Sequence, residues 1–95
     1  MSRSTAAAAL ILAQAHPDRP AREALEAVAR IRPRAWPNLR ILEFGDALLG
    51  RGGEIVTAAG AIYRRVLDRE PFLQEAMIDG GRGREVTAAL SLATR

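Results

Sequence analysis

Helix-breaking residues divide this chain into segments that are each long enough for only a short helix. Proline removes a backbone N–H and ends a helix, and glycine favours the left-handed turn that follows one. Between the breaks, apolar residues recur three and four positions apart, and no stretch alternates for long enough to indicate a strand. We therefore predict an all-α fold of about six short helices. The breaks lie at Pro17, Pro33, Gly50, Pro71 and Gly80–Gly81.

The predicted helices form three stacked antiparallel pairs, because short connections place helices that are neighbours in sequence side by side. The pairs cover approximately residues 4–31, 37–69 and 71–94. A chain of 95 residues has the length of one domain, so we assign residues 1–95 to a single helical domain.

The composition narrows the class of protein. Hydrophobic residues make up 48% of the chain and aromatic residues only 4%, which favours closely packed helices over a sheet. The chain has no cysteine, which excludes disulfides and thiolate metal sites. The apolar run Ala6–Ala13 is shorter than the roughly 20 residues that span a bilayer, and we interpret it as a buried helix rather than a signal peptide. We therefore expect a cytoplasmic protein with no membrane partner.

The sequence offers no recognisable catalytic, metal-binding or cofactor-binding group. Its single histidine, His16, has no carboxylate at a metal-ligand spacing and is expected to cap the C-terminus of a helix. Glu43 and Asp46 lie three residues apart on a predicted helix, but nothing else converges there, so we interpret them as solvated acids. The serines lie near the chain ends, away from any base. We therefore predict a protein that is not an enzyme and needs no cofactor.

One segment of the chain recurs. Residues 50–59, with the sequence Gly-Arg-Gly-Gly-Glu-Ile-Val-Thr-Ala-Ala, are similar to residues 81–89, with the sequence Gly-Arg-Gly-Arg-Glu-Val-Thr-Ala-Ala. Each copy follows an apolar helix and leads into another, as in stacked αα-hairpins. No strand precedes either glycine-rich segment, so we interpret both as tight turns rather than phosphate-binding loops. The alternative is chance similarity in a chain rich in alanine, glycine and arginine.

Residues 36–77 carry a recognisable pattern of helix-contact positions. Trp36 and Leu39 have the spacing Trp-x-x-Leu at the start of a predicted helix, and small, aromatic and proline positions follow. In this pattern the chain resembles a tetratricopeptide repeat. The resemblance implies stacked helix pairs with a concave surface that binds proteins or peptides. The further matching positions are Gly45, Ala59, Tyr63 and Pro71.

A second pattern overlaps the first. Val56–Gly60 and Tyr63–Arg65, followed by Glu70–Ala76, are similar to the helix-turn-helix and exit region of phage small terminase subunits. That family binds viral DNA and assembles into rings, so the resemblance implies DNA binding and oligomer formation. The chain between Gly60 and Tyr63 is too short for a turn and the start of an independent recognition helix, which argues against sequence-specific reading of DNA.

The strongest candidate for a binding site is the segment 30–40, which contains four arginines, one tryptophan and no acid. Guanidinium groups pair with phosphates or carboxylates, and an exposed tryptophan stacks on a base or anchors a peptide. Of the net charge of +3, residues 1–40 contribute +4 and residues 41–95 contribute −1. The alternative is a tryptophan in the core and solvated arginines at a helix end. The candidate residues are Arg30, Arg32, Arg34, Trp36 and Arg40.

Together these patterns favour a non-enzymatic adaptor or assembly protein that binds another protein or its own copies. The alternative is a phage-type DNA-packaging protein, similar to a small terminase subunit, or a non-specific DNA-binding protein that oligomerises. Nucleic acid would then bind through residues 30–40, and the burial of Trp36 tests whether that segment offers an aromatic contact.

Overall fold

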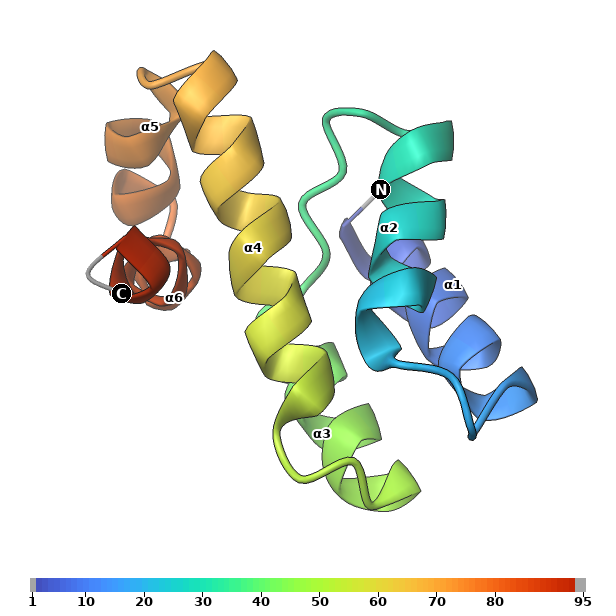
Figure 1. The fold of residues 1–95 in the computed structure, drawn as a ribbon. Coiled ribbons are helices and arrows are strands. Elements are labelled where there is room, and N and C mark those ends of the chain that lie inside the picture. The colour runs from blue at the N-terminus through green and yellow to red at the C-terminus, as the bar shows by residue number, and fades with distance from the viewer. Residues whose placement is uncertain (1, 94–95) are drawn as a thin grey trace.

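The computed structural model describes residues 2–93, with side chains described through residue 91. Within this range the chain forms six α-helices and no strand, which confirms the all-α prediction (Figure 1). Thr94, at the predicted end of the third helix pair, lies outside the described residues. None of the described helices is both long enough and apolar enough to cross a membrane. The helices are α1 (Ser2–Ala15), α2 (Ala21–Ile31), α3 (Leu39–Leu49), α4 (Glu54–Arg69), α5 (Leu73–Asp79) and α6 (Gly83–Ala93).

The first four helices form two hairpins that stack side by side. Helix α1 packs against α2 and α3, and α4 packs against the same two helices. Helices α1 and α3 run parallel, as a contact at each end of the pair shows. Where the two helices begin, the amide of Asn38 donates to the carbonyl of Ser2 (3.1 Å). At the other end, Arg51 donates to the carbonyl of Ala13 (3.1 Å). In Figure 1, α1 lies behind α2 and α3 begins behind α4, so α1 and α3 form one layer and α2 and α4 the other.

The third helix pair differs from the antiparallel hairpin that the sequence predicts. No residue of α5 is buried, and α6 packs mainly against α4. Figure 1 shows α6 almost end-on and α5 from the side, so the two helices cross at a steep angle. The reason is a contact between parts of the chain that are distant in sequence. Glu85 of α6 binds the segment that joins α2 to α3, and this bond holds α6 across the stack.

Small residues allow α1 and α3 to approach closely. Ala6, Ala9 and Ala13 of α1 are buried. A Cβ atom at Gly45 of α3 would overlap the side chain of Leu10 of α1, so a larger residue there would force Leu10 to move. The core beneath this layer is built from larger side chains, among them Leu25, Leu42, Ile55 and Tyr63.

The two similar segments, 50–59 and 81–89, make equivalent contacts. In each, the arginine at the second position pairs with the glutamate three residues later, at 3.2 Å and 2.5 Å respectively. Each glutamate also accepts a hydrogen bond from the first amide of an earlier helix. Glu54 binds the N-terminus of α2 (3.0 Å), and Glu85 binds the N-terminus of α3 (2.8 Å). The segments therefore share a structural task, which is to turn the chain and cap a neighbouring helix.

Asp46 is not the solvated acid that the sequence analysis proposes. Its carboxylate is buried and accepts hydrogen bonds from the amides of Gly53 (2.7 Å) and Ile55 (2.8 Å) at the N-terminus of α4. Gly50, in the left-handed conformation (φ 65°), ends α3 and turns the chain so that this bond can form. Asp46 therefore joins α3 to α4 by capping the second helix from within the first.

The C-terminus of α1 is also capped by an unexpected residue. Arg51, in the turn between α3 and α4, donates to the carbonyls of Ala13 (3.1 Å) and His16 (3.3 Å). A guanidinium group at this place is favoured by the negative end of the helix dipole. Within the described residues this role belongs to Arg51, and the imidazole of His16 is exposed.

Candidate functional site

The structure decides between the two alternatives for Trp36, because its side chain is only 7% exposed. The indole Nε1 donates to Glu85 (2.6 Å), and the ring packs on Tyr63 with centroids 4.6 Å apart. Trp36 is therefore a core residue, and the proposal that it stacks on a base or anchors a peptide from an exposed position is wrong.

Tyr63 of α4 also holds the segment between α2 and α3. Its hydroxyl donates to the carbonyl of Pro37. Burial raises the pKa of Tyr63 above its usual value, and the nearby charge of Glu85 raises it further, so the hydroxyl remains a donor. The extended chain between α2 and α3 is thus held by a tyrosine and a glutamate from two other helices.

The arginines of the segment 30–40 do not gather into one site. Arg34 pairs with Glu70 (2.8 Å). Arg30, Arg32 and Arg40 are exposed and have no acidic partner among the described residues. Arg30 lines a groove between α1 and α2, whereas Arg32 and Arg34 line a different cavity beside Trp36. The arginines are spread out because the chain between α2 and α3 is extended, so the two ends of this segment lie apart (Figure 1).

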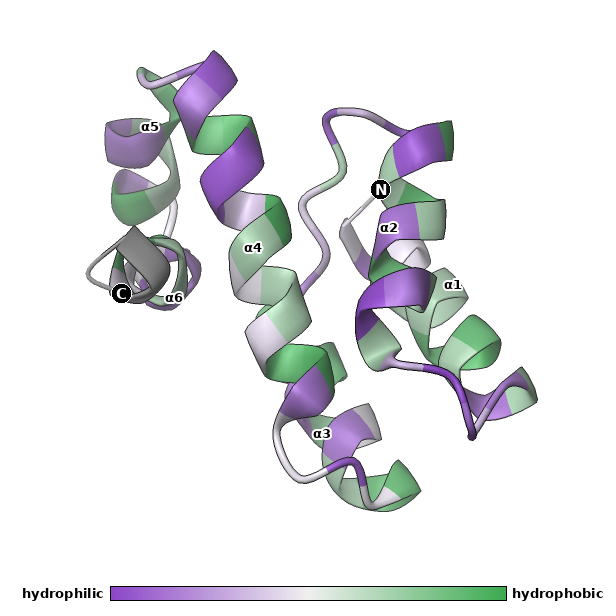
Figure 2. Cartoon of the chain, in the orientation of Figure 1, coloured by the Kyte–Doolittle hydropathy of each residue, from purple (hydrophilic) through white to green (hydrophobic). Residues whose placement is uncertain are grey.

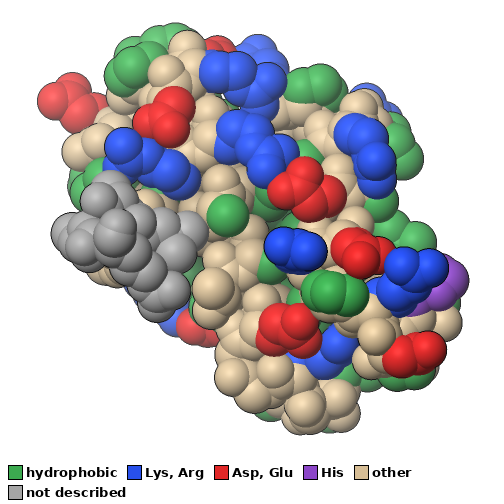
Figure 3. Space-filling view, in the orientation of Figure 1, with side chains coloured by type: hydrophobic (Ala, Val, Ile, Leu, Met, Phe, Trp, Pro, Cys, Tyr) green, Lys and Arg blue, Asp and Glu red, His purple; other side chains and the backbone are tan. Residues whose placement is uncertain are grey.

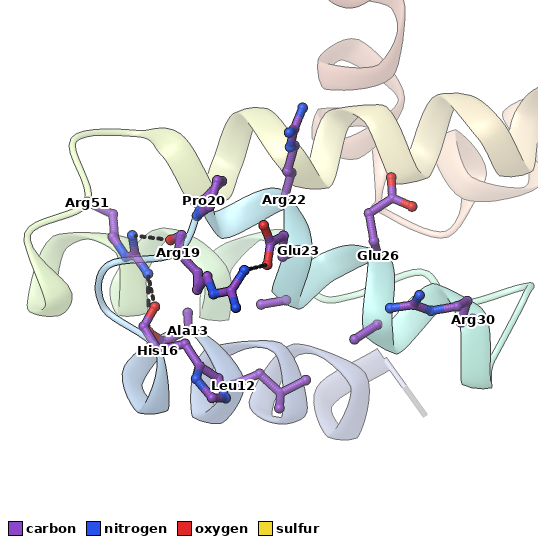
Figure 4. A pocket seen from close by; sticks show the side chains of 12 residues that line it. Leu12, Ala13, His16, Arg19, Pro20, Arg22, Glu23, Glu26, Arg30 and Arg51 are labelled. Carbon is purple, nitrogen blue, oxygen red and sulfur yellow. Dashed lines mark hydrogen bonds and ion pairs between the residues drawn. The ribbon is translucent and has the colours of Figure 1, made fainter.

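The groove between α1 and α2 has a volume of about 640 Å³. Figure 4 shows Arg19 reaching Glu23 (3.6 Å) over the groove, while Arg51 closes one end. Glu26 points away from α1 and binds Arg65 of α4 (2.7 Å), and this bond keeps the pKa of Glu26 below its usual value. Most of the charge around the groove is therefore compensated within the protein, and Arg22 and Arg30 are the arginines there without an acidic partner among the described residues.

An exposed apolar surface lies on the outer side of α1 and α3, and it is more distinctive than the groove. Phe44 and Leu48 lie one turn apart on α3 and are 70% and 81% exposed, and Ile11 of α1 is 65% exposed. We call this surface the α1/α3 face and define it by these three side chains and the exposed Ala7 and Ala8 of α1. All five residues are exposed, so their side chains lie away from the buried faces of α1 and α3.

Helical spacing places Phe44 and Leu48 among the apolar positions of α3, and that spacing does not reveal their exposure. The available signal is in α1, where the nine residues from Thr5 to Ala13 contain no charge. A helix that is apolar on all sides is normally buried on all sides. Figure 2 shows α1 in green along most of its length, although one side of it is open to solvent.

The opposite layer has a different surface. In Figure 3, which views α2 and α4 from the front, basic and acidic side chains are intermixed. The ion pair between Arg65 and Glu26 joins the two helices, and Arg64 pairs with Asp68 (3.0 Å) along α4. Exposed ion pairs of this kind are typical of a solvated surface. The unusual surface of the stack is therefore the α1/α3 face.

Comparison with models of known protein families, with curated proteins and with solved structures finds no match for this chain.

Proposed function

We propose that this protein is a non-enzymatic assembly module whose α1/α3 face binds another protein chain. The observation that carries the proposal is the exposure of Phe44 and Leu48, one turn apart on α3. Monomeric proteins seldom expose large apolar side chains together, and such patches mark interaction surfaces. Residues Ala7, Ala8 and Ile11 extend the patch onto α1.

The occupant that this surface fits best is a second copy of the chain. The face carries large side chains on α3 and small ones on α1, and the two helices are parallel and adjacent. Phe44 and Leu48 of one copy can pack over Ala7 and Ala8 of the other, and the reverse contact forms at the same time. This self-complementarity is what a two-fold symmetric interface requires. Small residues at the contact also let helices approach closely.

The resemblance of residues 36–77 to a tetratricopeptide repeat adds support, since arrays of that kind present a surface for protein binding. In this proposal the first helix of each stacked pair, α1 and α3, provides the surface. A cytoplasmic location belongs to the same proposal.

Light scattering over a concentration series, from about 1 to 500 µM, tests the proposal. We expect the wild-type protein to be dimeric at the upper end of the range. The double variant F44S/L48S should be at least about tenfold weaker in self-association, because exposed apolar anchors dominate such interfaces. The matched control is F72S, which removes an equally exposed phenylalanine (68%) from outside the α1/α3 face.

Each outcome of this experiment decides something. A dimer lost in F44S/L48S and kept in F72S supports the proposal. A wild-type monomer throughout the range rules out the second copy as the occupant. A dimer equally weakened by F72S places the interface elsewhere on the molecule.

A second candidate function is non-specific binding of nucleic acid, as the resemblance to phage small terminase subunits implies. One observation favours it. Arg30, Arg32 and Arg40 are exposed and have no acidic partner among the described residues. Guanidinium groups without partners are available to phosphates. Because Trp36 is buried, this binding would use backbone phosphates and not base stacking.

Titration of a random-sequence duplex by fluorescence anisotropy tests this function. The logarithm of the binding constant should fall with the logarithm of salt concentration, with a slope of about −0.9 for each phosphate neutralised. The triple variant R30A/R32A/R40A should flatten that slope by about two to three units. Equal binding by the variant, or no binding at low salt, argues against it.

A further inference from the structure

A second cavity lies beside the segment that joins α2 to α3. Its volume is about 410 Å³, within the range of roughly 300–1,000 Å³ that is usual for small-molecule sites. The N-terminus of α1, the end of α2, the segment itself and α5 all contribute to its lining. With Arg82 of the turn between α5 and α6, five separate parts of the chain therefore meet around one hollow.

Apolar residues make up part of the cavity lining, and we call this part its floor. Trp36 has one side covered by Tyr63 and its indole nitrogen bound to Glu85, so the remaining edge of its ring contributes apolar surface to the cavity. Ala35 and Met77 line it as well. Ile31, which is 76% exposed, stands at its wall and would be covered by a molecule in the cavity.

Positive charge surrounds this apolar floor. Arg32, Arg34 and Arg82 all line the cavity. Arg82 already binds Glu85 and the hydroxyl of Ser2 (2.9 Å), and Arg34 binds Glu70. Arg32 has no acidic partner among the described residues. An apolar cavity with an uncompensated guanidinium at its wall matches a ligand with an apolar body and one anionic group.

We propose that this cavity binds a small amphipathic acid, with its apolar body against Trp36, Met77 and Ile31 and its anionic group on Arg32. A carboxylate and a phosphate monoester share the chemistry that Arg32 recognises. The site lies apart from the side chains that define the α1/α3 face, so its failure would leave the proposed assembly function untouched.

Trp36 provides the readout, because it is the single tryptophan of the chain and lies at the cavity floor. The experiment titrates the protein at pH 7 with octanoate, octyl phosphate and neutral octanamide. Trp36 fluorescence and isothermal titration calorimetry both follow binding. We expect saturable binding of at least one of the two anions, with a dissociation constant of about 1 mM or lower. The tighter of the two anions identifies which acid group the site prefers.

The variant R32A should weaken binding of that anion by about tenfold, since a hydrogen bond to a charged group is lost. The matched control is R30A. Arg30 lies two residues earlier, is also exposed and lacks an acidic partner among the described residues, but it lines the groove between α1 and α2. R30A should leave the affinity unchanged within about twofold. A second variant, I31S, changes an exposed residue and should also weaken binding.

The proposal is overturned if octanamide binds as tightly as the anions or if R30A weakens binding as much as R32A. It is also overturned if neither readout saturates below about 10 mM. Circular dichroism spectra that match the wild type confirm that each variant is folded. Because Arg32 and Ile31 are exposed, neither substitution should disturb the core.

Discussion

At the scale of single residues, Glu85 joins α6 to the segment between α2 and α3, and no feature of the sequence suggests this role. Its carboxylate is buried and accepts hydrogen bonds from the indole of Trp36, the amide of Leu39 and the guanidinium of Arg82. The sequence shows Glu85 only as part of a recurring segment, because its other partners lie 46 and 49 positions away. Periodicity describes local structure and contains no information about such pairs.

Replacing Glu85 by alanine should lower the free energy of unfolding by about 3–5 kcal/mol, because removing a buried ionic group leaves its partners unpaired. Glu85→Gln keeps one acceptor and should cost less. Urea denaturation followed by circular dichroism measures both. The control is Glu75→Ala at an exposed position, which should change stability by at most about 0.5 kcal/mol. If E85A and E75A were equally stable, the connecting role of Glu85 would be wrong.

Tyr63 gives the protein a pH dependence that can be isolated. Burial raises the pKa of Tyr63 above its usual value, so the folded protein keeps the hydroxyl neutral where the unfolded chain ionises. Its contribution to stability is therefore complete below about pH 10 and is lost as pH rises further, by about 1.4 kcal/mol per pH unit. No other side chain titrates strongly between about pH 9 and 12, because the chain has no lysine and no cysteine.

Urea denaturation at a series of pH values from 8 to about 11.5 measures this effect. In Tyr63→Phe the alkaline loss of stability should disappear, although the variant is less stable at neutral pH for want of the bond to Pro37. An unchanged alkaline loss in Y63F would show that another group is responsible.

At the scale of helices, local signals in the sequence account for most of the element boundaries. Proline and glycine end the helices because of backbone geometry, and α2 and α3 end at Ile31 and Leu49 as predicted. The orientation of α6 was not predictable in this way, since it depends on the distant contact of Glu85 with the chain between α2 and α3. Likewise, helical spacing identifies Leu48 as part of an apolar stripe without telling core from surface.

The close packing of α1 on α3 predicts a specific sensitivity at Gly45. A Cβ atom there would overlap Leu10, so Gly45→Ala should destabilise the fold by about 1–3 kcal/mol, although alanine favours helices in general. Adding Leu10→Ala should recover part of that loss, because the overlapping side chain is removed. A double-mutant cycle in urea measures the coupling. Strictly additive effects of the two substitutions would contradict the contact.

At the scale of the whole molecule, the two layers of the stack present contrasting surfaces. Helices α2 and α4 are joined by the ion pair of Arg65 with Glu26 and carry mixed charges (Figure 3). The α1/α3 face exposes Ile11, Phe44 and Leu48 instead. This contrast could be foreseen only in part from the sequence. The uncharged run in α1 indicates a helix that needs cover on all sides, but the pairing of α1 with α3 is a tertiary contact.

In the proposed dimer, the α1/α3 face packs against the same face of a second copy, with α3 of one copy over α1 of the other. Since the chain has no cysteine, disulfide cross-linking of introduced cysteines tests this contact directly. Equimolar A8C and L48C proteins are mixed and oxidised, and the control mixes L48C with A61C, which changes an exposed alanine of α4 in the opposite layer. The proposal predicts a disulfide-linked dimer of A8C with L48C well above the yield for A61C with L48C. Equal yields from the two mixtures, or no cross-link in either, would contradict it.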